Sequence, residues 1–404
     1  MSSATTAAVR SETDRTPAFL AGTFGWTLDA FDFFLVVFCL TAIGREFHKP
    51  DTTASLAIVM TLAFRPAGGF LFGLLADRYG RRRPMIWNLA LCALVQLLSG
   101  LAPNFGTFLV SRAMFGMVMG GQWGVGASLA MEKVPARLRG LLSGILQQGY
   151  AAGYLLAALA YSLMFERFGW RPLFFVACVP ALAMAVFVAL KVQESQVWEQ
   201  TRQPSWGSLG RAVASNWKLL VYITLFTMTM HMSSHGSQDM YPTFLERHWG
   251  FGASRRALLT ACSMLGALAG GTLCGYLSDR WGRRRSMIAA LSGALLVTPL
   301  WAFAPTVGLL VTGAFLMQFL IQGAWGVVPA HLAELAPDSV RGFLPGFGNA
   351  CGVVLASSVV YLEAVFARRS SYPLAMASTA AVVLAAAIAM TAAGGEKRAA
   401  RFGK

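Results

Sequence analysis

The chain has 404 residues, 56% of them hydrophobic and only 13% charged, and it carries a formal net charge of +15. A soluble domain of this length would be less apolar, so the composition indicates a membrane protein. The basic residues fall in short loops between apolar runs and not along one amphipathic face, which argues against nucleic-acid binding.

Cysteine usage and loop motifs give no sign of a cofactor. Six cysteines stand singly among apolar residues without a CxxC pair, which is typical of small buried hydrophobic side chains. No Gly-rich loop ending in Lys-Ser or Lys-Thr is present, so no nucleotide site is predicted. We expect neither a cofactor nor a metal, and no removable signal peptide in the polar N-terminal stretch.

Apolar spans follow one another along the chain, and several reach the roughly 20 residues that cross a bilayer. We place a cytoplasmic tail at 1–17, a six-helix bundle at 18–192, a central cytoplasmic loop at 193–216, a second six-helix bundle at 217–393 and a basic cytoplasmic tail at 394–404. The first bundle has expected spans at 20–43, 54–77, 84–102, 106–131, 139–163 and 171–192. The second has expected spans at 217–246, 254–277, 286–304, 307–334, 342–366 and 372–393.

The distribution of Lys and Arg predicts the orientation of these spans. Loops on the side of both termini hold 22 basic residues, whereas loops on the opposite side hold nine. Because basic residues concentrate in cytoplasmic loops, both termini are expected in the cytoplasm. We expect a multi-pass protein of a bacterial inner membrane.

A short basic stretch occurs twice, and the two copies are 202 residues apart. The first copy is Gly73-Leu-Leu-Ala-Asp77-Arg78-Tyr-Gly80-Arg81-Arg82-Arg83, and the second is Gly275-Tyr-Leu-Ser-Asp279-Arg280-Trp-Gly282-Arg283-Arg284-Arg285. A second block keeps the same spacing: Trp123, Glu132, Pro135, Arg139 and Gly140 recur as Trp325, Glu334, Pro337, Arg341 and Gly342. We infer a tandem duplication, because parallel repeats of membrane helices build many transporters.

The repeated aspartates, Asp77 and Asp279, fall at the inner ends of the second and eighth spans. A carboxylate at such a place can accept hydrogen bonds from nearby arginines or from a helix N-terminus. We predict a conformational latch between the two halves, composed of Asp77, Arg81, Arg139, Asp279, Arg283 and Arg341. The alternative is simple anchoring by basic loops, which would need neither the Asp nor the Gly of the repeated pattern.

These paired loops resemble the signature of the major facilitator superfamily, and the resemblance covers nearly the whole chain. It implies an all-α membrane protein with twelve transmembrane helices in two pseudo-symmetric six-helix bundles. It also implies a transporter that alternates between inward-open and outward-open states. An enzyme is not expected, since the sequence shows no nucleophile–base pair and no cluster of metal ligands.

Charged side chains lie inside the first two spans, where each costs at least about 2.5–3.5 kcal/mol on insertion scales. Asp29 and Asp32 share one helical face because they are three residues apart, and Arg65 lies about halfway along the next span. A structural ion pair between Arg65 and one aspartate is one explanation. It leaves the second aspartate as a candidate proton site.

The seventh span carries three titratable residues at a spacing of four: His231, His235 and Asp239. This spacing puts them on one helical stripe, and histidine changes its charge near physiological pH. We predict a proton relay, with hydrogen-bonded packing of the histidines as the alternative. In the fifth span, Gln148 and Tyr154 are candidates for a polar cavity.

The stretch Ser234-His-Gly-Ser-Gln-Asp-Met-Tyr-Pro-Thr243 resembles the signature of carboxylate–proton symporters that transport lactate and related monocarboxylates. The resemblance implies that His235 and Asp239 couple protons and that Arg65 recognises the carboxylate, to which a guanidinium gives two parallel hydrogen bonds. The chain departs from that pattern at His231, where the signature has Asn. It also departs at Gly346, where the family often has Gln, although the neighbouring Asn349 is kept. Sialic acid transporters of this branch carry two extra central helices, for which 193–216 is too short.

We therefore predict a secondary active transporter that carries a small monocarboxylate, such as lactate or pyruvate, together with a proton. The expected substrate-binding residues are Arg65, Asn349, Gln148 and Tyr154. The expected proton-coupling residues are His235, Asp239, His231, Asp29 and Asp32. The expected partners are the carboxylate, protons and the lipid bilayer, and we expect a monomer. The alternatives are an aromatic-acid or dicarboxylate proton symporter, or a membrane sensor on the same fold that does not transport.

Overall fold

The computed structural model describes residues 15–200 and 204–403. Most of the expected N-terminal tail, 1–17, lies outside the described residues, and the helix α2 already begins at Arg15. Residues 201–203 of the expected central loop and the last residue of the expected C-terminal tail also lie outside them.

The first half of the chain is helical. Its helices are α2 (Arg15–Glu46), α3 (Asp51–Ala54), α4 (Leu56–Tyr79), α5 (Arg82–Gly100), α6 (Phe105–Lys133), α7 (Arg139–Gln147), α8 (Gly149–Phe168) and α9 (Arg171–Lys191). A 3₁₀ turn, η1 (Ala136–Leu138), precedes α7. The segment expected as a central loop carries two short helices, α10 (Gln196–Gln200) and α11 (Trp206–Ser215).

The second half repeats this order. Its helices are α12 (Trp217–Gln238), α13 (Tyr241–Arg247), α14 (Ala253–Trp281), α15 (Arg283–Ala302), α16 (Val307–Leu335), α17 (Phe343–Ala356), α18 (Ser358–Arg369) and α19 (Tyr372–Ala393). A second 3₁₀ turn, η2 (Asp338–Val340), precedes α17, as η1 precedes α7. The described residues contain no β-strand, so the all-α prediction is confirmed.

Each expected span coincides with one helix or with two helices joined end to end, namely α7–α8, α12–α13 and α17–α18. Within the described residues, eight helical segments are long and apolar enough to cross a membrane on length and composition alone. The segments outside that set include α12, which carries the polar stripe, and α7–α8, which is divided at Gln148. The outer surface is apolar, with Leu190 75% and Leu296 82% exposed, as a surface covered by lipid requires.

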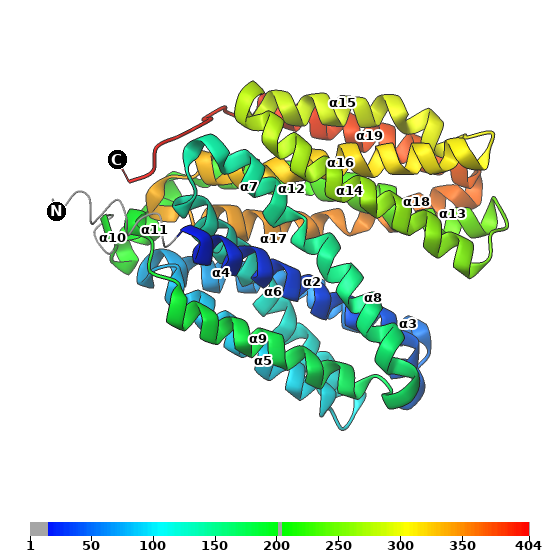
Figure 1. The fold of residues 1–404 in the computed structure, drawn as a ribbon, viewed down its shortest axis with the longest axis horizontal. Helices are drawn as coiled ribbons and strands as arrows, with labels where there is room; N and C mark the ends of the chain where they lie inside the picture. The colour runs from blue at the N-terminus through cyan, green and yellow to red at the C-terminus, as the bar shows by residue number, and fades with distance from the viewer. Residues whose placement is uncertain (1–14, 201–203, 404) are drawn as a thin grey trace.

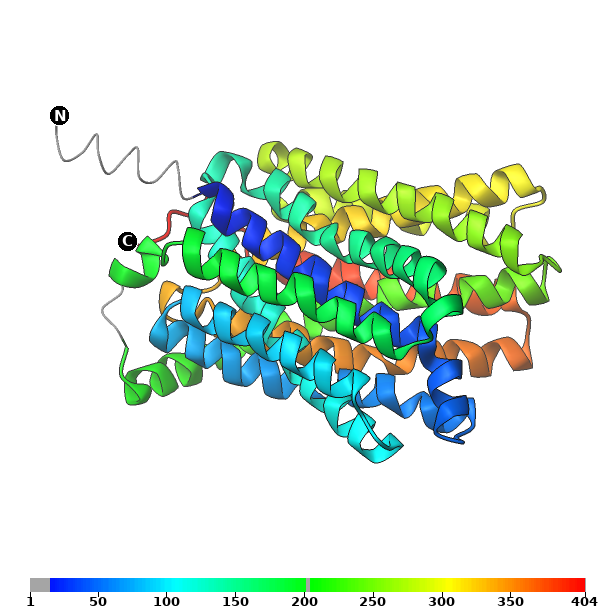
Figure 2. The same cartoon turned by 60° about the horizontal axis from the view of Figure 1, so that its bottom comes forward.

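The two halves lie close together at the end that carries the start of α2 and the C-terminal tail, and they diverge toward the other end (Figure 1). Figure 2 shows the same long helices running side by side from end to end. Across the interface α4 packs against α17, and α14 packs against α7. These two pairs are related by the sequence repeat, so the contact between the halves is pseudo-symmetric.

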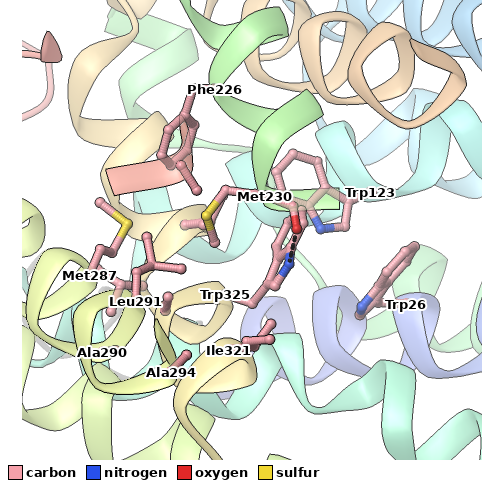
Figure 3. Close-up of a cluster of buried hydrophobic side chains, with 14 of the residues drawn as sticks. Trp26, Trp123, Phe226, Met230, Met287, Ala290, Leu291, Ala294, Ile321 and Trp325 are labelled. Atoms are coloured by element: carbon pink, nitrogen blue, oxygen red, sulfur yellow. Dashed lines mark hydrogen bonds between the residues drawn. The ribbon is translucent and has the colours of Figure 1, made fainter. Parts of the chain in front are cut away.

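A cluster of buried apolar side chains includes residues from both halves (Figure 3). Trp26 and Trp123 come from the first half, and Met230 and Trp325 come from the second. The indole Nε1 of Trp325 donates a hydrogen bond to the Met230 carbonyl at 3.1 Å, which ties α16 to α12. This contact fixes the face of α12 on which the polar stripe lies.

Candidate functional site

A cavity of about 470 Å³ lies between the two halves. Its walls come mainly from α2, α4, α7 and α8 on one side and from α12, α14 and α16 on the other, with single contributions from α6, α15 and α17 and two residues of α13. Six of the residues predicted for the site line it: Arg65, Gln148, Tyr154, His231, His235 and Asp239. The rest of the lining is largely apolar and aromatic, including Trp26, Phe33, Phe34, Tyr150, Trp301 and Trp325.

Arg65 is 5% exposed, and no residue in the described part of the chain forms an ion pair with it. Its Nε is buried without a hydrogen-bond partner. The backbone of α4 at this point lies against α6, where a Cβ on Gly120 would come within 1.9 Å of the Arg65 carbonyl oxygen. Close helix packing therefore fixes the base of the side chain, while the guanidinium remains available to a ligand in the cavity.

The polar stripe of α12 is held by hydrogen bonds along its length. His231 Nε2 lies 3.0 Å from Asn349 Oδ1, and its ring packs on Trp325 with centroids 4.6 Å apart. His235 Nδ1 lies 3.0 Å from Asp239 Oδ2, at the more open end of the stripe. Asn349, predicted to bind substrate, is not among the cavity-lining residues and instead orients His231.

Gln148 and Tyr154 reach the cavity from the first half. Gln148 stands at the break between α7 and α8, and its Nε2 fills the space left by Gly271 of α14, where a Cβ would be 1.6 Å away. Tyr154 makes an edge contact with Phe34 at 4.8 Å between centroids. Both residues therefore lie at the wall between the halves.

Asp29 and Asp32 are fully buried in the first bundle and do not line the cavity. Asp32 Oδ2 accepts a hydrogen bond from the Cys92 thiol at 3.1 Å, and Arg112 and Gln96 also face it. One oxygen of each aspartate lacks a hydrogen-bond partner in the described residues. The structure thus separates these two aspartates from the stripe of α12.

Amides on α16 complete the polar wall, and sequence reasoning missed them. Gln318 Oε1 accepts from Gln238 Nε2 at 2.7 Å, and Gln322 Nε2 donates to Ser234 Oγ at 3.2 Å. Both glutamines line the cavity. They are four residues apart in an apolar span and so share one helical face. A search for polar side chains inside apolar spans, which identified Arg65 and the stripe of α12, would also have found them.

The predicted latch residues meet at the end where the halves are closed. The Asp77 carboxylate accepts hydrogen bonds from the backbone amides of Gly342 and Phe343, at 2.8 and 2.9 Å. The symmetric Asp279 carboxylate accepts from the amides of Gly140 and Leu141, also at 2.8 and 2.9 Å. Each aspartate therefore caps the N-terminus of a helix in the opposite half.

Arginines brace this pair of caps. Arg81 Nη1 lies 2.8 Å from Asp77, and Arg283 Nη1 lies 2.8 Å from Asp279. Across the interface, Arg139 pairs with Glu334 at 2.9 Å, and Arg341 lies 3.5 Å from Glu132. These charges are buried, so each would carry a large desolvation cost if it stood alone. Their pairing at the closed end offsets that cost.

Two further glutamates at this end were missed by sequence reasoning. Glu194 accepts a hydrogen bond from the Arg81 amide at 2.7 Å, and Glu396 accepts one from the Arg283 amide at 3.0 Å. The two glutamates keep the 202-residue spacing of the repeat. Extending the repeat to the loops that follow the sixth and twelfth spans would have revealed them.

The C-terminal tail lies across the closed end. The Phe402 ring lies between the guanidinium groups of Arg139 and Arg341, which are 3.9 and 3.7 Å from its centroid. The amide of Ala399 donates a hydrogen bond to Glu334 at 3.2 Å. Because Arg139 belongs to the first half and Arg341 to the second, Phe402 joins the two halves.

The described residues contain no group of three or more His, Cys, Asp or Glu side chains that could hold a metal ion. The site is instead a cavity with one buried cation on one wall and a histidine–carboxylate pair on the other. Such an arrangement can bind an organic anion and exchange a proton beside it.

Comparisons with known proteins agree with this architecture. A carboxylic acid transporter protein homolog from Saccharomyces cerevisiae is 27% identical over 90% of this chain, which spans 63% of that relative. A cis,cis-muconate transport protein from Acinetobacter baylyi is 26% identical, and the match covers 80% of this chain and 81% of that protein. The solved structure of the proton:xylose symporter XylE superposes with a TM-score of 0.79 at 17% identity, covering 97% of this chain and 98% of that one. Residues 22–247 and 240–401 match the Major Facilitator Superfamily. The chain therefore belongs to this superfamily, whose members here are named as transporters and not as enzymes.

Proposed function

We propose that this protein is a secondary transporter that carries a small monocarboxylate, such as lactate or pyruvate, together with a proton by alternating access. The observation that supports it best is the Arg65 guanidinium, which has no ion-pair partner among the described residues and faces the same cavity as the His235–Asp239 pair. Asp29 acts on this buried cation only from beyond ion-pair distance, so a carboxylate entering the cavity gains a strong, bidentate interaction there. The carboxylic acid and muconate transporters among the relatives support an organic acid as substrate.

Coupling follows from what each wall of the cavity can do. Arg65 holds the substrate carboxylate, and the His235–Asp239 pair takes up the proton, so the loaded cavity carries less uncompensated charge than a half-loaded one. Binding of the acid and binding of the proton must therefore favour each other, and by linkage the effect is reciprocal. Asp32, which faces Arg112, and Asp29, which lies within electrostatic range of Arg65, form a second proton-binding region behind this wall.

Alternating access uses the latch. The excess of basic residues on the side of the termini supports placing both termini in the cytoplasm, which makes the closed end the inner one and this conformation an outward-facing one. Release of the Asp77 and Asp279 caps would let the halves separate at the inner end and close at the outer one. Substrate and proton would then leave together to the cytoplasm.

Uptake of labelled lactate into proteoliposomes with an inside-alkaline pH gradient tests this function. We expect Arg65→Ala to abolish uptake, and Arg65→Lys to restore it only in part because an ammonium cannot form the bidentate contact. His235→Ala and Asp239→Asn should lose accumulation while Asp239→Asn keeps exchange. Arg167→Ala removes an exposed arginine and serves as the control. Concentrative uptake at the wild-type level in all of these variants would refute the assignment, and ligand binding without any flux would indicate a sensor.

A second candidate substrate class is an aromatic acid or a dicarboxylate. The aromatic lining of the cavity, with Trp26 stacked on Tyr150 at 5.7 Å between centroids, favours it, as does the muconate transport relative. Competition of labelled lactate with benzoate and with succinate separates the classes. Benzoate as the strongest competitor would favour an aromatic acid, and succinate a dicarboxylate.

A further inference from the structure

A buried acidic side chain lies near the end of α12 that carries the exposed Asp239. Glu363 of α18 is 1% exposed, and both of its carboxyl oxygens are buried without a hydrogen-bond partner in the described residues. It does not line the cavity. Glu363 belongs neither to the latch nor to the cavity wall, so neither role explains a buried acidic side chain at this position.

Among the described residues, no cation forms an ion pair with Glu363. Helix α18 packs on α19 and α12. Helix α19 has no charged side chain and Tyr372 as its titratable group, while α12 brings Lys218 at its far end and His231 and His235 on the cavity side. Arg368 and Arg369 of α18 itself are exposed. The group whose charge reaches Glu363 is Asp239, which follows the last residue of α12.

The two helices approach each other closely here. A Cβ on Gly236 of α12 would lie 3.7 Å from the Val359 side chain, and Val359 is one turn before Glu363 on the same buried face. Asp239 lies at the break where α12 gives way to α13, whereas Glu363 lies in the middle of α18. Asp239 and Glu363 follow the two contacting residues, Gly236 and Val359, by three and four positions, so both acids lie about one turn beyond this contact.

We propose that Glu363 is a proton-binding site of the transporter that exchanges its proton with Asp239. This inference rests on the proton coupling proposed above. A carboxyl group that is buried without a hydrogen-bond donor or an ion-pair partner costs far less free energy with a proton than without one. When the outer ends of α12 and α18 rearrange, the O–H bond of Glu363 breaks and one forms on Asp239. The two acids thus share one proton. Glu363 gives the His235–Asp239 pair a second proton-binding site that lies outside the cavity.

The test is Glu363→Gln, which has the shape of the neutral acid. Purified wild type and variant are compared by infrared difference spectroscopy at neutral pH, and both are assayed in proteoliposomes for lactate exchange and for proton-driven accumulation. We expect the wild type to show the C=O band of a protonated carboxylic acid that the variant lacks. We also expect unchanged thermal stability and exchange, with loss of accumulation. Glu166→Gln, at an exposed glutamate, is the control and should change neither property.

Each other outcome decides against the proposal. Absence of the band in wild type would show that Glu363 is charged, and a destabilised Gln variant would show that its carboxyl group has a structural role. Accumulation and proton-to-substrate ratio equal to wild type would show that its proton takes no part in transport. If wild-type protein itself accumulates no carboxylate, the proposed function fails, whereas the infrared result still reports on Glu363.

Discussion

The hydrogen bond between His231 and Asn349 links the polar stripe of α12 to α17. We predict that His231→Asn keeps uptake, because an amide can still bond to Asn349, whereas His231→Leu leaves the buried Asn349 side chain unsatisfied. That loss costs about 1–3 kcal/mol. Thermal unfolding and lactate uptake of both variants check it. A Leu variant as stable and active as the Asn variant would contradict the role given to this bond.

At the scale of single residues, the sequence predicts which side chains line the cavity better than it predicts the contacts of the polar side chains inside the first bundle. Arg65 and the His235–Asp239 pair are recognisable because charge inside an apolar span needs a reason. The three-residue spacing of Asp29 and Asp32 shows that they share a face, but it carries no information on which neighbour that face meets. Only the packing of α2 against its neighbours places them beside Cys92 and away from the cavity.

At the scale of helices, the caps of the latch are the contacts most open to test. In Asp77→Asn, an amide NH₂ replaces one acceptor oxygen at the N-terminus of α17. Loss of hydrogen bonds to a charged group costs about 1.5–3 kcal/mol, so the local opening constant should rise about tenfold or more. Hydrogen exchange of the Gly342 and Phe343 amides measures this rise.

The repeat supplies a matched comparison for that experiment. Asp279→Asn should raise exchange at Gly140 and Leu141 by a similar factor, and Glu166→Gln should raise neither. If both aspartate variants leave exchange unchanged, the carboxylates do not hold the closed end.

The length of the apolar runs in the sequence predicts the long helices, but it does not predict where those helices break. Pro242 explains the break after α12, whereas Gln148 and Ser357 carry no comparable signal.

At the scale of the whole molecule, Phe402 is a contact that both halves share. Because its ring lies between Arg139 and Arg341, Phe402→Ala should weaken the closed end on both sides at once. Each cation–π contact contributes about 0.5–2 kcal/mol, so we expect a smaller rise in exchange than in Asp77→Asn, at both helix N-termini. Phe366→Ala, at a more exposed ring on α18, is the control. A change confined to one half, or none, would show that the tail does not join them.

The duplicated sequence predicts the pseudo-symmetric architecture well. Asp77 and Asp279, with their arginines, recur in one register, and the structure makes the same pair of hydrogen bonds in each copy. What a single sequence does not reveal is the partner of each copy. Each aspartate caps a helix of the opposite half, and this exchange between halves follows from three-dimensional assembly and not from local sequence.

The central claim is that Arg65 and the His235–Asp239 pair act on one cavity, in which a carboxylate and a proton move together. Its most direct test is the internal pH of proteoliposomes, recorded as external lactate is added without a preset pH gradient. The account predicts internal acidification that depends on lactate, exceeds that of protein-free liposomes and disappears in Asp239→Asn. Lactate entry without acidification, or equal acidification in that variant, would contradict it.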